Sequence, residues 1–308
     1  MESNTSRFSK FSKALIVLGI LLVIAFTIMV SSVAEMVGKI SGGSGFLGDK
    51  KPHLTVFKLE GPIFGSDEAL EILSRISEDE QCKGLLVRVD SPGGAVGASQ
   101  EIYSALRRLR EKGLPLVVSM GNVAASGGYY VSLAGQTLFA NPGTLTGSIG
   151  VILQFPEAEK LLDKIGISLQ TIKSGALKDA GNFGRKATPQ DLRYFQGVID
   201  DAYDQFLNDV AENRRLPVDS VRLVADGRVL TGRQALKAGL VDTLGGLDRA
   251  KAFLIAKAKV AEDIHWLEEP KPKSRIQKFL DSESSSPALA WLTGLKEKIN
   301  PGVFFLWR

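Results

Sequence analysis

Short apolar segments alternate with amphipathic ones through much of the sequence, and this alternation limits the fold more than any other feature. Residues 54–59, 84–89 and 114–120 have the length and the Val and Leu content of buried strands. Between these segments, residues 67–80 and 97–111 carry apolar side chains at helical spacing. Such alternation is typical of an α/β fold with largely parallel strand pairing, and we predict that fold class.

The same alternation continues towards the C-terminus. It predicts strands at 137–140, 148–153 and 168–173, and helices after residue 128 and at 156–165, 188–213, near 218, 231–238 and 247–260. Asp67 is the predicted N-cap of the helix over 67–80. Thr188 is the predicted N-cap of the longest helix, with Pro189 at its first position and Asp191 in its first turn. An apolar stripe runs along that helix through Leu192, Phe195, Ile199, Ala202, Phe206 and Val210.

An uncharged apolar run occupies residues 14–30 and extends to residue 34. A bilayer-spanning helix needs about 20 apolar residues, with about 17 as the lower limit. The apolar core of a cleavable signal peptide has about 7–15. We therefore expect a permanent transmembrane anchor over residues 14–34. Ser32-Val33-Ala34 also suits a cleavage site, so a removed leader stays open as the alternative.

The anchor divides the chain into five predicted parts. Residues 1–13 are basic, and cations before an anchor favour a cytoplasmic N-terminus, with the remainder on the extracytoplasmic side. Residues 35–52 are a flexible linker, whose G-x-G-x-x-G spacing follows no strand and so predicts no dinucleotide site. The α/β domain covers residues 53–262. Residues 263–308 form a C-terminal linker and a small amphipathic segment.

Composition argues against several classes of site. The 308 residues include a single cysteine, Cys82, so no disulfide can form within the chain. There are two histidines, His53 and His265, and no Cys/His cluster that would indicate zinc. The net charge of +4 owes much to the N-terminal cations, and nothing in the rest of the chain favours nucleic acid as a partner.

Residues 122–130, N-V-A-A-S-G-G-Y-Y, contain the candidate nucleophile Ser126. Small residues on both sides permit a sharp turn and the close approach of a substrate. Ala124 departs from the G-x-S-x-G elbow of the α/β-hydrolases, and a plain Gly-rich turn before a packed helix is the alternative. Neither histidine lies where the core would bring it to the serine, so a lysine is the better candidate for its base.

Four Gly-bearing loops follow predicted strand ends. They are residues 90–94, 125–128 and 146–150, and the loop over 174–187 that carries Lys178. Ligand sites of open α/β folds collect at the carboxyl ends of the strands. We therefore expect these loops to converge on one site.

The motifs V-D-S-P-G-G, A-A-S-G-G-Y-Y, T-G-S-I-G-V and K-S-G-A-L-K-D-A-G occur in this order. Together they resemble the signal peptide peptidase A (SppA) family, in its short form with one catalytic repeat, over about residues 54–255. The resemblance implies a membrane-anchored serine peptidase with a Ser-Lys dyad on a ClpP/crotonase-like fold. It also implies a homo-oligomer, in which adjacent protomers can complete the dyad.

The resemblance assigns a role to each matching residue. Ser126 matches the nucleophile, Lys178 the general base and Ser148 the serine that orients the lysine. Gly93 matches the glycine whose backbone N–H serves the oxyanion hole, with Gly94 beside it. A lysine is a base only when neutral, so a catalytic lysine needs a pKa lowered from about 10.4 towards roughly 7–8.

A negative charge next to such a lysine opposes that change. We therefore expect the carboxylate of Asp179, the next residue, to point away from the amine. Ser91 is a rival nucleophile, but Pro92 after it removes a useful N–H donor. The mechanism requires no metal and no cofactor.

The implied activity is hydrolysis of remnant signal peptides and other apolar peptides near the membrane. The implied location is a bacterial inner membrane, crossed once, with the catalytic domain on the extracytoplasmic side. Two alternatives stay open at this point. One is an acyl-CoA enzyme on the crotonase fold, and the other is a catalytically silent membrane scaffold.

Overall fold

The computed structural model describes residues 51–268 and 304–306. The predicted cytoplasmic segment, the anchor over 14–34, most of the linker and most of the C-terminal segment lie outside the described residues. Within the described ranges, no helix is both long enough and apolar enough to cross a bilayer. The described residues belong to one compact unit, Lys50–Arg308.

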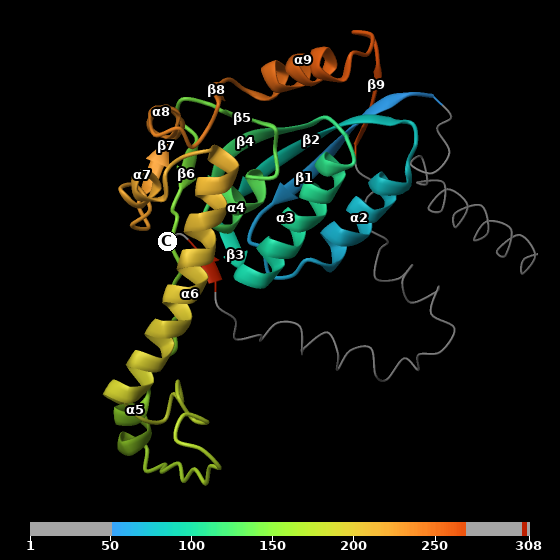
Figure 1. Cartoon of the computed structure of the whole chain (residues 1–308). Coiled ribbons are helices and arrows are strands. Elements are labelled where there is room, and N and C mark those ends of the chain that lie inside the picture. Colours follow the sequence, from blue (N-terminus) through green and yellow to red (C-terminus); the bar gives the residue numbers. More distant parts are fainter. Residues whose placement is uncertain (1–50, 269–303, 307–308) are drawn as a thin grey trace, which may run out of the picture. The chain divides into compact units, whose positions relative to one another are not determined.

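The centre of this unit is an eight-stranded sheet with the order β7-β6-β4-β2-β1-β9, in which β5 joins β4 to β8 (Figure 1). Apart from β6 with β7, its strands pair in parallel, which confirms the predicted fold class. The strands of the sheet are β1 (His53–Glu60), β2 (Cys82–Ser91), β4 (Leu116–Ala125), β5 (Thr137–Ala140), β6 (Leu145–Gly147), β7 (Val229–Thr231), β8 (Thr243–Leu244) and β9 (His265–Glu268).

A second, two-stranded sheet lies beside the carboxyl ends of the central strands. It pairs β3 (Gly93–Ala95) with β10 (Phe304–Leu306) in antiparallel register. The helices are α2 (Asp67–Glu78), α3 (Val96–Glu111), α4 (Gly127–Ser132), α5 (Glu159–Lys164), α6 (Pro189–Arg214), α7 (Val218–Arg222), α8 (Gly232–Lys237) and α9 (Leu247–Ala258).

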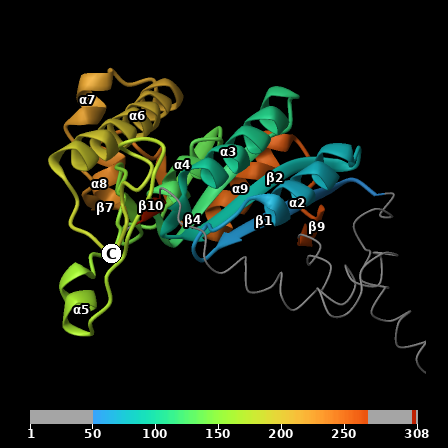
Figure 2. The same cartoon turned by 90° about the horizontal axis from the view of Figure 1, so that it is seen from below.

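Helices cover both faces of the central sheet. Ala250 and Leu254 of α9 pack on one face, against Leu54, Leu86 and Val117 from three neighbouring strands. Figures 1 and 2 show α2 and α3 on the opposite face. This three-layer arrangement explains why the strands are continuous apolar runs, because strands that are buried on both faces need apolar side chains throughout.

The strand that leads to Ser126 forks the sheet. Residues 117–119 of β4 pair with β5, whereas residues 123–125 pair with β6. On its other side β4 pairs with β2, and the register shifts between Val89 and Ser91. The carboxyl end of β4 therefore lies between β2 and β6, and the turn that carries Ser126 follows it directly.

Several expected elements are confirmed, and a few are wrong. Residues 168–173 do not form a strand, and neither do residues 148–153, where β6 ends at Gly147. Ser148 has a φ of 51°, a left-handed conformation that does not continue a strand. The N-cap of α2 is Ser66 rather than Asp67. The sheet also extends beyond the predicted boundary at residue 262, since β9 pairs with β1.

Long helix α6 buries its apolar side chains at one end only. Its C-terminal half packs Phe206, Leu207 and Val210 into the core, whereas Leu192 in its first turns is 55% exposed. Figure 1 shows this N-terminal half extending away from the sheet. The predicted apolar stripe is therefore present, but only its C-terminal part is buried within this chain.

Residues 152–198, which we call the arm, carry an unusual surface. Apart from Phe64, Leu223 and Phe253, every exposed large hydrophobic side chain among the described residues lies in the arm. These arm residues are Ile152, Leu161, Ile165, Ile167, Leu169, Ile172, Phe183, Leu192, Tyr194 and Val198. Exposed apolar side chains that gather on one part of a protein are typical of an interaction site.

Candidate active site

Ser126 lies at the end of β4 and caps α4. Its backbone has φ 55° and ψ −119°, outside the regions that a residue with a side chain normally adopts. Two hydrogen bonds hold it there: Ser126 N–H donates to the carbonyl of Gly147 at 2.8 Å, and Tyr130 N–H donates to the carbonyl of Ser126 at 2.8 Å. A strained backbone at a non-glycine residue costs about 1–3 kcal/mol and is concentrated at functional sites.

The two glycines after Ser126 are required by close packing. A Cβ on Gly127 would lie 2.5 Å from Ser99 Oγ and 3.1 Å from the amide nitrogen of Gly94. A Cβ on Gly128 would lie 2.6 Å from the carbonyl oxygen of Ser91. The S-G-G sequence therefore lets the start of α4 approach the turn after β2, and brings two of the predicted loops together.

The hydroxyl of Ser126 is buried and unpartnered. The residue is 1% exposed, and its Oγ has no hydrogen-bond partner in the described part of the chain. Neither histidine can supply one. His53 is level with Cys82, and Ala124 is level with Ser91. Cys82 and Ser91 are nine residues apart in β2, so His53, and His265 beside it, lie about 30 Å along the strands from the end of β4 that leads to Ser126.

Asp90 and Ser91 organise the turn after β2. The carboxylate of Asp90 accepts hydrogen bonds from Val123 N–H at 3.0 Å and from Asn122 Nδ2 at 3.1 Å, which fixes the last residues of β4. Ser91 Oγ accepts the N–H of Gly93 at 3.1 Å. Sequence reasoning missed the role of Asp90, although its position at a strand end inside a quoted motif was a usable signal.

Gly93 and Gly94 form the start of β3, beside Ser126. Gly93 has a φ of 97°, and its carbonyl accepts the N–H of Ile63 at 2.9 Å. A Cβ on Gly94 would lie 1.9 Å from the carbonyl oxygen of Ile63. The Gly93 N–H is directed to Ser91 Oγ here, whereas the Gly94 nitrogen lies next to Gly127. Both amides are thus close to the Ser126 turn, and their part in an oxyanion hole stays a prediction.

An extended segment of the same chain runs along β3. Phe305 pairs with Gly94 and Leu306 with Gly93, in antiparallel register. The backbone edge beside the candidate nucleophile is therefore able to bind an extended peptide by main-chain hydrogen bonds.

Ser148 also lies at this site. Gly147, the residue before it, pairs with Ala125 and accepts the N–H of Ser126. Ser148 is 5% exposed, and its own N–H donates to the carbonyl of Arg228 at 2.9 Å. The fold thus brings Ser126, Ser148, Gly93 and Gly94 together, as the convergence of their loops predicted.

Lys178 is not brought to them within one chain. It lies in the arm, in a series of tight turns. Its backbone N–H donates to the carbonyl of Gly175, and the N–H of Ala180 donates to the carbonyl of Leu177. Its side chain is exposed and makes no hydrogen bond or ion pair with the residues that the structure describes. The second half of the predicted dyad therefore stands apart from the first.

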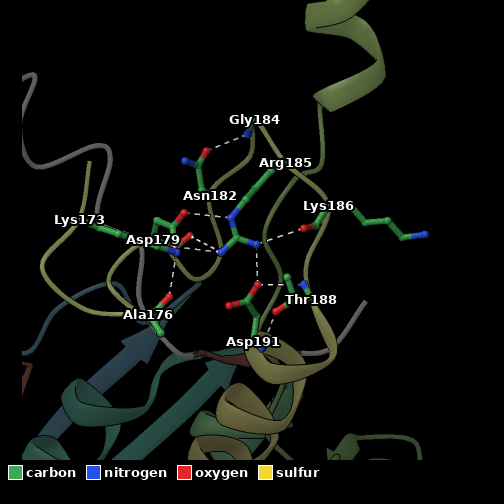
Figure 3. Close-up of polar contacts among 9 residues, drawn as sticks. All are labelled: Lys173, Ala176, Asp179, Asn182, Gly184, Arg185, Lys186, Thr188 and Asp191. Carbon is green, nitrogen blue, oxygen red and sulfur yellow. Dashed lines mark hydrogen bonds and ion pairs between the residues drawn. The ribbon is translucent and has the colours of Figure 1, made fainter. Parts of the chain in front are cut away.

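The residues around Lys178 form a dense polar cluster (Figure 3). Arg185 binds the carboxylate of Asp179 with Nε at 3.0 Å and Nη2 at 3.1 Å, and its Nη1 binds Asp191 at 2.6 Å. Lys173 Nζ lies 2.5 Å from Asp179. Hydrogen bonds from Arg185, and then from Lys173, lower the pKa of Asp179 to about 2. Sequence reasoning missed Arg185 because no spacing rule connects it to Lys178.

No metal site is evident at any of these positions. Within residues 51–268 and 304–306, no group of three or more His, Cys, Asp or Glu side chains is placed to hold a metal ion. What the arrangement offers instead is a buried hydroxyl, backbone N–H groups and a strand edge that binds extended chain. These parts suit attack on a backbone carbonyl.

Comparison with known proteins agrees with this chemistry. The model of peptidase family S49 matches residues 108–261, which include both Ser126 and Lys178. The chain belongs to peptidase family S49. It is therefore a serine peptidase of the group that includes SppA, protease 4 and SohB.

Individual relatives cover different shares of their own length. A Synechocystis sp. protein that is provisionally named as a protease, slr0021, is 41% identical over 238 residues, which are 74% of this chain and 86% of that protein. The chloroplastic serine protease SPPA of Arabidopsis thaliana is 34% identical over 75% of this chain, but over only 36% of its own length. Protease 4 of Haemophilus influenzae is 37% identical over 64% of this chain and 33% of its own.

Proposed function

We propose that this S49 peptidase is a membrane-anchored endopeptidase in which Ser126 is the nucleophile and Lys178 the general base. The observation that carries the proposal is the Ser126 turn. A buried hydroxyl with no hydrogen-bond partner among the described residues, on a strained backbone beside the amides of Gly93 and Gly94, has no structural purpose that a glycine or alanine would not serve better.

The reaction follows from the position of these groups. Ser126 Oγ attacks the substrate carbonyl carbon, and its proton passes to the neutral amine of Lys178. The negative charge that develops on the carbonyl oxygen is stabilised by the backbone N–H groups of Gly93 and Gly94. One such donor contributes about 3 kcal/mol to the stability of the transition state. Ser148, which directly follows the Gly147 whose carbonyl accepts the Ser126 N–H, orients the lysine.

A second copy of the chain supplies Lys178. Two observations support this. The side chain of Lys178 is exposed and makes no hydrogen bond or ion pair with the described residues, and the arm that carries it has the main concentration of exposed apolar residues among them. Packing of the arm against a neighbouring protomer would bury that surface and place the Lys178 amine beside Ser126 of that protomer. Desolvation in such an interface also favours the neutral form of a lysine.

The substrate is an extended apolar peptide. The pairing of residues 304–306 with β3 supports binding of substrate by strand addition at the same edge. The predicted anchor over residues 14–34 would hold the domain at a bacterial inner membrane, on the extracytoplasmic side, where remnant signal peptides are released. We also propose that the fold is of the ClpP/crotonase type, with the loops after β2 and β4 forming the site.

Mixing inactive variants tests the proposal directly. Full-length Ser126→Ala and Lys178→Ala proteins are each purified in detergent and assayed with a fluorogenic apolar peptide, then mixed under conditions that permit subunit exchange. Each variant alone is expected to be inactive. The mixture is expected to regain activity, because some sites combine Ser126 from one protomer with Lys178 from another. Full activity of Ser126→Ala would refute the nucleophile, and inactive mixtures despite proven subunit exchange would refute the shared site.

A further inference from the structure

Asp179 sets a problem for a base at position 178. A carboxylate next to a lysine stabilises the protonated amine, which cannot accept a proton from serine. The structure shows how this charge is held. The side chain of Asp179 is only 10% exposed and is bound by two cations, Lys173 and Arg185.

Arg185 is the centre of this arrangement. Its Nε and Nη2 bind the two carboxylate oxygens of Asp179. Its remaining nitrogen, Nη1, donates to the carboxylate of Asp191 and to the main-chain carbonyl of Lys186. Its Nη2 donates to the main-chain carbonyl of Asp179 as well, at 3.2 Å. One side chain thus fixes the backbone and the carboxylate of the residue that follows Lys178.

The second carboxylate that Arg185 binds, that of Asp191, is buried and hydrogen-bonded. Asp191 is 2% exposed and belongs to the capping box of α6, in which its carboxylate accepts Thr188 N–H and its own N–H donates to Thr188 Oγ1. Arg185 therefore connects the turn of Lys178 to the first turn of a 26-residue helix. Bidentate guanidinium–carboxylate contacts are the geometry in which arginine is not replaceable by lysine.

We propose that Arg185 is a positioning residue for Lys178, which turns the charge of Asp179 away from the amine and ties the Lys178 turn to α6. The proposal rests on the role of Lys178 given above. The charged groups that face Asp179 are Lys173 from the preceding coil, Arg185 from the following turn and Asp191 from α6. Lys186 is next in sequence, but its side chain points away from the cluster in Figure 3.

The pH profile of kcat/KM in the full-length enzyme separates this role from a purely structural one. Arg185→Ala removes a positive charge that offsets the Asp179 carboxylate, so protonation of the Lys178 amine is favoured. The acidic limb of the kcat/KM profile is therefore expected to move to higher pH, by roughly 0.5–1 unit. Asp179→Asn moves the limb in the opposite direction. The double variant Arg185→Ala/Asp179→Asn returns the limb towards the wild-type position.

Lys186→Ala is the matched control, because it removes one positive charge one residue away and keeps the main-chain carbonyl that Arg185 binds. It is expected to leave the profile unchanged. An unshifted limb in Arg185→Ala, no restoration in the double variant, or an equal shift in Lys186→Ala would overturn the proposal. If Arg185→Ala fails to assemble, Asp179→Asn alone decides, since a limb that does not move to lower pH also refutes it. These outcomes are distinct from failure of the dyad, in which Lys178→Ala keeps its activity.

Discussion

Gly94→Ala perturbs the closest backbone contact beside Ser126. An ideal Cβ at this position would lie 1.9 Å from the carbonyl oxygen, 2.5 Å from the carbonyl carbon and 2.7 Å from the nitrogen of Ile63. All three atoms belong to the main chain, so no side-chain rotation relieves the clash. Either β3 or the segment after β1 must move.

Overpacking of this kind costs about 1–3 kcal/mol, and a purely backbone clash belongs at the upper end of that range. In a domain of this size, each kcal/mol lowers Tm by about 2–4 °C, so we expect a fall of roughly 6–12 °C. Displacement of the β3 amides from the proposed oxyanion hole should also reduce kcat by about 10²–10³-fold.

Thermal unfolding and peptidase assays of the full-length protein measure both effects. Gly97→Ala is the matched control, since a Cβ at that position in α3 has nothing within 4 Å. Its stability should stay within about 1 kcal/mol of wild type. A Gly94→Ala protein with the wild-type Tm and the wild-type kcat would show that the close approach of β3 to Ile63 does not constrain the site.

Three further predictions concern the arm and the strand edge. Thr188→Ala should lower the stability of the start of α6 by about 1 kcal/mol, because it removes the capping box of this helix. Hydrogen exchange of the amides in the first turn measures the effect, and Thr231→Ala, the equivalent change in α8, is the comparison. The pKa of Asp179 is held at about 2, so the ionised carboxylate contributes its full stabilisation above about pH 4 and loses it as the pH falls towards 2. Asp179→Asn should remove this part of the pH dependence of unfolding. An unaltered pH dependence would contradict the prediction. Deletion of residues 304–308 should free the edge of β3 and lower KM at least about threefold with kcat unchanged, whereas an unchanged KM would mean that this pairing does not compete with substrate.

The parts of the fold that sequence predicts well are those with local causes. Apolar runs such as 84–89 become buried strands because a strand covered on both faces needs apolar side chains throughout. The start of α6 is equally local, since Thr188, Pro189 and Asp191 meet the requirements of a helix N-terminus without help from the rest of the chain.

The errors have non-local causes. Residues 168–173 alternate like a strand, but the folded chain pairs them with none of the described strands. At 148–153 the strand is stopped by the left-handed backbone of Ser148, which is held by the carbonyl of Arg228, eighty positions further along. The four residues of β9 carry no strand pattern, and only the open edge of β1 makes them one.

The candidate site divides in the same way. Motifs identified Ser126, Ser148, Gly93 and Gly94, and the parallel sheet brings their loops together as expected. No motif shows whether Lys178 reaches Ser126 within one chain, because that depends on the direction of a long helix. The contacts of Asp90 and Arg185 were missed because each links segments whose proximity only the folded chain defines.

Strands β1 and β9 pair in parallel, with His53 level with His265, and so the first and last strands of the central sheet are neighbours. During synthesis, β1 leaves the ribosome more than two hundred residues before its outer partner. Until then one edge of β1 is an open template for pairing with other chains, as unpaired strand edges are. The nascent domain is thus most vulnerable to aggregation at its oldest strand, and completion of the sheet depends on its youngest.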